Sequence, residues 1–137
     1  DVHGITKGKG VQGPGKRFGV AILSHKAHKT KRGVAGVGPW NPSKVSYRRP
    51  VAGKMGFHTR TEYNKYLLKI GNKPVEVIPK GDFLQYGKIK ADYVLIKGSV
   101  VGSRKRAIIL THPRRENKKL LLPQLEIKYI SKASKQG

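Results

Sequence analysis

Positive charge constrains this chain more than any other sequence feature. Of its 137 residues, 30 are Lys or Arg and 7 are Asp or Glu, which gives a formal net charge of +23. Charges of one sign repel each other in a compact state, so we expect the fold to need counterions or a polyanion. The length suits about one domain. This balance argues against a free-standing enzyme for acidic substrates and favours a nucleic acid or another anionic surface as the partner.

Several kinds of chemistry are excluded by residue types that the chain lacks. It has no cysteine, which excludes disulfides, zinc–thiolate sites and thiol catalysis. No apolar run approaches the ~18–20 residues that span a bilayer, and the first residues lack the apolar segment of a signal peptide. The sequence begins with Asp1 rather than Met, so we expect a processed or cut piece.

Short apolar runs, most of them in the second half of the chain, predict a mainly β fold. Most are rich in β-branched or aromatic residues, and turn-forming residues lie between them. Short strands at this spacing fit a barrel or a sandwich. For Thr61–Leu68, one or two helical turns are predicted instead. The predicted strands are Val2–Ile5, Phe18–Leu23, Tyr66–Ile70, Val75–Ile78, Tyr93–Ile96, Ala107–Thr111 and Leu125–Ile130.

The stretch between Ser24 and Arg60 has almost no periodic apolar pattern. A segment of this length without its own core is either disordered or a functional extension. Its cations are interleaved with aromatic rings, and Trp40 lies between Pro39 and Pro42, a setting that presents a ring rather than burying it. Cations for phosphates together with planar groups for unstacked bases are typical of RNA recognition. We therefore favour an ordered, RNA-inserting extension over a disordered basic tail.

Two glycine motifs near the N-terminus resemble nucleotide sites but lack residues that such sites need. Gly8–Gly13 has the G-x-G-x-x-G pattern, but Pro14 and Gly15 follow it where a well-packed helix should open, and no acidic residue is nearby to hold a ribose. The P-loop pattern at residues 10–17 ends in Arg17 instead of Ser or Thr. A better use for these glycines is close approach of backbone N–H groups to phosphates.

The histidines and serines predict neither a metal site nor a catalytic site. His25 and His28 are three residues apart, but neither Cys nor a carboxylate accompanies them. Imidazoles on a basic surface are the simpler interpretation. Ser24 and Ser43 lack the surroundings of a nucleophile elbow. We therefore expect a binding protein rather than an enzyme.

Five segments of the chain closely resemble the universal large-subunit ribosomal protein L-three family, in its archaeal and eukaryotic form. They run in order through most of the sequence, and residues 131–137 are also similar. Together they are far more specific than either glycine motif alone. The segments read DVHGITKGKG at 1–10, GVGPWNP at 36–42, AGKMGFH at 52–58, RTEYNK at 60–65 and VLIKGSV at 94–100.

This resemblance implies a translation-factor-like β-barrel, incomplete in a C-terminal portion of the family's chain, with a long, irregular basic extension. In the family the extension threads through rRNA towards the peptidyl transferase centre, and its tip carries the Trp that matches Trp40. Family members are not enzymes; they sit in the large subunit in the cytoplasm, act in its assembly and neighbour the L-fourteen family. No cofactor is implied beyond structural magnesium ions held mainly by rRNA. The implied organisation is barrel strands and a Gly-rich basic turn at 1–23, the extension at 24–60, and the remaining barrel strands with a basic C-terminal tail at 61–137.

The residues expected to bind rRNA all lie in the first 60 positions. Glycines and cations at the root would approach the RNA backbone, cations along both arms would neutralise phosphates, and Trp40 would stack or wedge at the tip. Lys54 stands where many family members have Gln, so the methylation known for that Gln is not expected here. The expected residues are Lys7, Gly8, Lys9, Gly10, Gly13, Lys16, Arg17, His25, Lys26, His28, Lys29, Lys31, Arg32, Trp40, Lys44, Arg48, Arg49, Lys54, His58 and Arg60.

Two functions of other classes are the alternatives. An extra-ribosomal nucleic-acid chaperone that binds by charge alone predicts a disordered arm at 24–60 and no preference for one rRNA site. An NTP-dependent enzyme that uses Gly10–Lys16 predicts magnesium-dependent nucleotide binding, and Arg17 and the missing acids oppose it.

Overall fold

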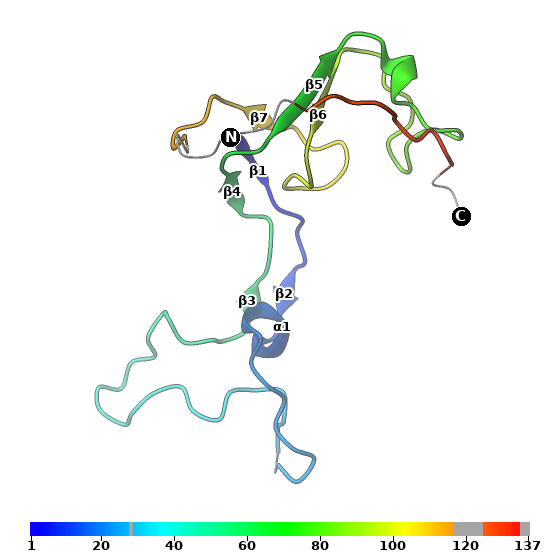
Figure 1. Ribbon diagram of the computed structural model, residues 1–137. Helices are drawn as coiled ribbons and strands as arrows, with labels where there is room; N and C mark the ends of the chain where they lie inside the picture. Colours follow the sequence, from blue (N-terminus) through cyan, green and yellow to red (C-terminus); the bar gives the residue numbers. More distant parts are fainter. Residues whose placement is uncertain (28, 117–124, 135–137) are drawn as a thin grey trace. The chain divides into compact units, whose positions relative to one another are not determined.

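The computed structural model describes residues 1–27, 29–116 and 125–134, and it divides the chain into two compact units (Figure 1). The first unit combines Asp1–Thr6 with the chain from Thr59 onward, and the second is Lys7–His58. The elements are β1 (Val2–Ile5), β2 (Val11–Gln12), α1 (Pro14–Phe18), β3 (Gly53–Lys54), β4 (Thr59–Glu62), β5 (Leu67–Gly71), the 3₁₀ turn η1 (Pro74–Glu76), β6 (Tyr93–Ile96) and β7 (Ile109–Leu110).

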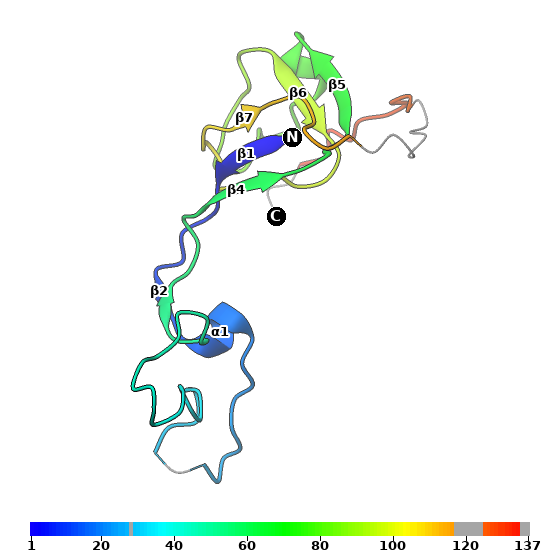
Figure 2. The same cartoon turned by 90° about the vertical axis from the view of Figure 1, so that its left-hand side faces the viewer.

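Strand β1 is the centre of a three-stranded antiparallel sheet in the first unit, between β4 and β7 (Figure 2). Val2 pairs with Glu62 on one side and with Leu110 on the other. The His3 ring links β1 to β4 and to the residue that follows β7, since its Nδ1 is 2.9 Å from the Thr61 hydroxyl and its Nε2 is 3.0 Å from the Thr111 hydroxyl. The start of the chain is thus bonded to segments about 60 and 110 residues away.

Strands β5 and β6 form a second antiparallel sheet, with a bulge between Leu67 and Lys69. The turn η1 is tied to this sheet by Glu76, whose Oε2 accepts a bond of 2.6 Å from Lys69 Nζ and one of 3.2 Å from the Tyr93 hydroxyl. The hydrogen bond and charge of Lys69, with the Tyr93 hydroxyl, hold the pKa of Glu76 below its ordinary value. The same bond to Glu76 raises the pKa of Lys69.

The buried core of the first unit is small. Within the described part of the chain, its buried apolar residues are Val2, Val77, Pro79, Tyr93 and Val101. Asp1 is also buried, and its two carboxylate oxygens accept backbone N–H bonds of 2.9 Å from residues 64 and 114. So few buried side chains leave little free energy to offset the entropy of ordering the chain.

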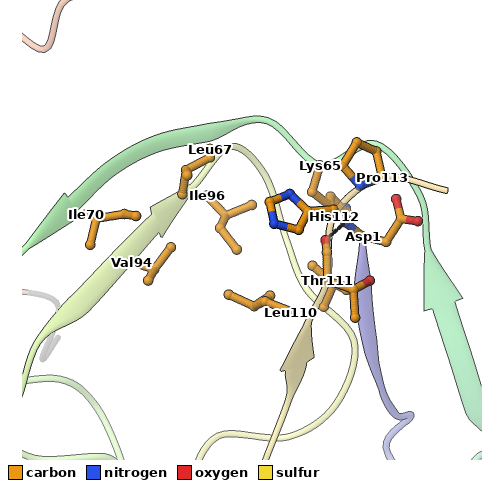
Figure 3. A pocket seen from close by; sticks show the side chains of 11 residues that line it. Asp1, Lys65, Leu67, Ile70, Val94, Ile96, Leu110, Thr111, His112 and Pro113 are labelled. Atoms are coloured by element: carbon orange, nitrogen blue, oxygen red, sulfur yellow. Dashed lines mark hydrogen bonds between the residues drawn. The ribbon is translucent and has the colours of Figure 1, made fainter. Parts of the chain in front are cut away.

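An apolar groove of about 380 Å³ lies between β5, β6 and β7 (Figure 3). The side chains of Leu67, Ile70, Val94, Ile96 and Leu110 border it, and Leu67, Ile70, Val94 and Leu110 are exposed. The apolar faces of these strands therefore stay open. The mainly β class predicted from the sequence is confirmed, but the described residues form three small sheets and no closed barrel.

Four of the predicted strands correspond to observed ones. Val2–Ile5 and Tyr93–Ile96 are strands with the predicted bounds. Tyr66–Ile70 is shifted by one residue to β5, and of Ala107–Thr111 only Ile109–Leu110 is a strand. Apolar runs rich in β-branched or aromatic residues thus marked these strands, and pairing decides how much of each run becomes a strand.

The other local predictions were wrong. Gly, Pro or a missing partner prevented three predicted strands, and strand pairing replaced a predicted helix. Val75–Ile78 is not a strand because Pro74 opens the turn η1. Phe18–Leu23 is not one because α1 ends at Gly19, which has φ 73°. Leu125–Ile130 has no regular structure, and Thr61–Leu68 contains strand rather than helix. Of the described helices, none has the length and apolar character needed to cross a membrane.

Candidate nucleic-acid interface

The second unit begins and ends in a short antiparallel ladder. Strands β2 and β3 pair Val11 with Lys54, and backbone bonds join Lys9 N to Met55 O (2.9 Å) and Met55 N to Gly10 O (2.8 Å). Gly56 lets this ladder close, because it has φ 75° and a Cβ there would overlap the Lys7 carbonyl oxygen. The ladder presents the cations near its ends on an ordered backbone.

Helix α1 follows the ladder directly and is one turn long. It starts at Pro14, which has no N–H to leave unbonded, and ends at Gly19. Pro14 and Gly15 thus open a single helical turn rather than the well-packed helix that a dinucleotide site needs. Helix α1 is five residues long, and the absence of an acid that could hold a ribose stands as before.

The cations at this root differ in how they are held. Lys7, Lys9 and Lys16 are exposed. Arg17 is half-buried: its Nη1 donates to the Val51 carbonyl oxygen at 2.9 Å and its guanidinium lies 4.9 Å from the Phe18 ring centroid. An added Cβ at residue 53 would lie 2.8 Å from that guanidinium, so the arginine packs against β3. Arg17 thus also supports the ladder, a contribution that the sequence did not predict.

The segment between α1 and β3 is irregular and highly exposed in its described residues. A bond of 3.0 Å from Leu23 N to Lys31 O closes one loop within it. His28 lies outside the described residues. The cationic and imidazole side chains expected to meet phosphates are all exposed here, namely His25, Lys26, Lys29, Lys31, Arg32, Lys44, Arg48 and Arg49.

Trp40 is presented to solvent, as the sequence predicts. Its side chain is 96% exposed, although Trp is among the residue types that usually lose most of their surface on folding. The neighbouring backbone is turned by a cis Asn41–Pro42 peptide bond and by a bond of 2.8 Å from Lys44 N to Pro42 O. An exposed indole on such a backbone is free to stack on a base.

Aromatic rings accompany several of the cations, a pairing that the predicted site set missed. Arg48 lies over the Tyr47 ring at 5.5 Å and its Nε donates to the Tyr47 hydroxyl at 3.1 Å. Lys54 lies over the Phe57 ring at 5.6 Å. The signal was present in the sequence, because each ring is within three residues of its cation. Such pairs hold a cation on a planar platform that can also stack.

The last predicted residues lie on both sides of the boundary between the units. His58 is half-buried and ends the second unit. Arg60 belongs to β4 of the first unit, where it is exposed and its Nη1 donates to the Thr59 carbonyl oxygen at 2.9 Å. Gly8, Gly10 and Gly13 lie exposed at the root. The set of residues expected to bind rRNA stays a prediction.

Charge in the second unit is of one sign. Residues 7–58 contain 12 Lys or Arg and no Asp or Glu. In the described residues no group of three or more His, Asp or Glu is placed to hold a metal ion. The chemistry that this arrangement supports is neutralisation of phosphates and stacking on bases.

Comparisons with known proteins point to one family over the whole sequence. The family model described as "Ribosomal protein L3" matches residues 1–137. Proteins named "Large ribosomal subunit protein uL3" are 50% identical over 139 residues in Methanocaldococcus jannaschii and in Archaeoglobus fulgidus, and 49% identical over 140 residues in Methanococcus vannielii. Each match covers 100% of this chain but only 41–42% of the relative. The expectation of a C-terminal portion is not supported by these matches.

Proposed function

Because this chain belongs to the ribosomal protein L3 family, we propose that it is a structural, non-enzymatic constituent of the large ribosomal subunit that binds rRNA. The observation that carries the proposal is the second unit, an ordered two-strand base from which exposed cations and an exposed Trp40 extend with no acidic residue among them. Such a surface suits a folded polyanion with unstacked bases.

The cations of the second unit would bind by releasing counterions from RNA phosphates. In a plot of log affinity against log salt concentration, each neutralised phosphate makes the slope more negative by about 0.7 for single strands and about 0.9 for a duplex. Gly10 has φ 66°, and an added Cβ there would meet no atom within 4 Å, which leaves room for RNA backbone next to Lys9. Arg17 and the ladder would keep these groups in place.

We also propose that the second unit forms the family's extension towards the peptidyl transferase centre, with Trp40 at its tip. The Trp40 ring is 96% exposed, so stacking on a base would remove much of its apolar surface from water. The hydrophobic effect and the stacking itself would both favour insertion. The partners proposed are large-subunit rRNA and neighbouring ribosomal proteins such as the L-fourteen family, in cytoplasmic ribosomes. No cofactor is proposed beyond magnesium held mainly by the rRNA.

A charge-driven nucleic-acid chaperone is the second candidate. The formal charge of +23 alone would support it. The two-strand base and the internally bonded Arg17 weigh against it, because binding by charge alone needs neither.

Competition binding separates these two functions. The 137-residue chain is titrated with large-subunit rRNA against an excess of unrelated structured RNA, from low to moderate salt. A preference that persists at moderate salt supports the ribosomal function, because shape and base contacts then add to charge. Equal affinity for both RNAs at moderate salt refutes it and leaves the chaperone.

The role of the tip is tested in reconstituted subunits that carry Trp40→Ala. We expect slower or less accurate accommodation of aminoacyl-tRNA. Tyr129→Ala is the matched control, since it removes another highly exposed aromatic ring (82% exposed) from the first unit. Unchanged accommodation in subunits that contain the Trp40 variant would refute a role of the tip.

A further inference from the structure

A second candidate RNA site lies in the first unit, outside every residue expected from the sequence. A groove of about 560 Å³ is bordered by ten residues: the rings of Phe83 and Tyr86, the cations Arg104, Lys105 and Arg106, Ser103, and four aliphatic side chains, Leu84, Ile89, Val100 and Ile108. The volume is within the range of roughly 300–1,000 Å³ usual for ligand pockets. No acidic residue borders it, although Asp82 and Asp92 lie nearby in the sequence.

The aromatic wall of the groove is built by a tight turn. Phe83 N donates to the Gly87 carbonyl oxygen at 3.3 Å, while the N–H groups of Tyr86 and Gly87 donate back to the Phe83 carbonyl oxygen at 3.1 and 3.0 Å. Tyr86 is 48% exposed and Phe83 is half-buried. The turn thus fixes the backbone beneath two rings before a ligand arrives, which lowers the entropy lost on binding.

The cationic wall comes from another turn. Arg106 N donates to the Ser103 carbonyl oxygen at 3.2 Å, and Lys105 has φ 66°. Arg104, Lys105 and Arg106 are all exposed. Three consecutive cations therefore face the same groove as the rings, in a chain that already carries an excess of positive charge.

We propose that this groove binds a single-stranded RNA segment, with a base stacked on Tyr86 or Phe83 and the flanking phosphates on Arg104 and Lys105. The aliphatic floor can hold the apolar face of a base as well as an apolar side chain, but an apolar peptide would need no cations and an acidic peptide would need no stacking platform. Rings beside cations with no acid among them therefore match a nucleotide best. The inference rests on the proposed function in that it takes RNA as the ligand, and it adds a site in the first unit.

The test uses the 137-residue chain and a single-stranded RNA octamer, with the duplex of the same sequence for comparison. Because the second unit also attracts RNA, the readout is local: the NMR signals of the Tyr86 ring, followed during titration. We expect these signals to shift with the single strand and not with the duplex. In Tyr86→Ala, where the titration is followed at the Phe83 ring instead, the affinity of the groove should fall about 10- to 100-fold.

Matched variants separate stacking from charge. Tyr86→Phe should keep the affinity, and Tyr129→Ala, which removes a ring outside the groove, should leave it unchanged. Arg104→Ala with Lys105→Ala should lower the salt slope by about 1.4, from two single-strand phosphates. The pair Lys88→Ala and Lys90→Ala removes the same charge from exposed positions that do not border the groove.

The outcomes distinguish this inference from the proposed function. A loss of octamer affinity in Tyr86→Ala, with none in Tyr86→Phe, supports binding in the groove. If that result comes with no preference for rRNA in the competition experiment, the groove stands and only the proposed ribosomal function fails. If the salt slope falls equally in the Arg104/Lys105 pair and in the Lys88/Lys90 control pair, the groove is not the binding site. A preference for rRNA would then still support the proposed function. Displacement of the octamer from Tyr86 by an acidic octapeptide of higher affinity overturns it in favour of a protein partner.

Discussion

One added methyl group at Gly56 tests whether the two-strand ladder organises the second unit. The residue has φ 75°, and the nearest atoms to an added Cβ are the backbone carbonyl of Lys7 and the Cα of Gly8. Backbone atoms cannot rotate away as the end of a side chain can. We therefore expect Gly56→Ala to push the two chain segments apart.

The cost can be worked from two parts. A left-handed conformation costs a non-glycine residue about 1–2 kcal/mol. Separation of the segments also breaks the bonds between Lys9 N and Met55 O and between Met55 N and Gly10 O, at about 1 kcal/mol each. The sum is about 3–4 kcal/mol, where 1.4 kcal/mol is tenfold in an equilibrium constant.

Amide hydrogen exchange at Lys9 and Met55 measures this cost directly. We expect exchange at both amides to accelerate by about 100- to 1,000-fold in Gly56→Ala, and by at least tenfold if part of the strain relaxes. The control is Gly36→Ala, because no atom lies within 4 Å of an added Cβ there. Unchanged exchange at Lys9 and Met55 in Gly56→Ala would refute the role given to the ladder.

Three further outcomes follow from single contacts. Trp40→Ala should shift the free energy of unfolding by no more than about 0.5 kcal/mol, since the ring is 96% exposed; a larger shift in urea unfolding would place the ring in a core. Lys69→Met should remove the stabilisation that the Lys69–Glu76 ion pair gives to wild type. That stabilisation exists only between two pH limits, because it is lost as pH falls through the lowered pKa of Glu76 and as pH rises through the raised pKa of Lys69. Urea midpoints measured across pH should therefore differ between the two proteins inside these limits and converge at both ends. Gly71→Ala should cost about 1–3 kcal/mol, because an added Cβ would overlap the buried Tyr93 ring; a melting temperature equal to that of wild type would contradict this packing.

Sequence reasoning worked best where the cause is local or compositional. The exposure of Trp40 follows from the prolines around it, and the strand Tyr93–Ile96 follows from a β-branched, aromatic run. It was wrong at Val75–Ile78, where Pro74 opens a turn, and at Leu125–Ile130, where an alternating run found no strand partner. A partner lies elsewhere in the chain, and a pattern read along one segment does not contain it.

The sequence by itself determined the sign and the distribution of charge in the second unit, because the lack of acids from residue 2 to residue 61 does not depend on folding. Tertiary structure alone decided which segments pair and which cations are engaged. It placed His3 between Thr61 and Thr111 and directed Arg17 to the Val51 carbonyl. It also brought the turn at residues 83–87 beside the cations of the turn at 103–106. Contacts of this kind join residues 17 or more positions apart, and their geometry is set by the whole chain's packing rather than by any local preference.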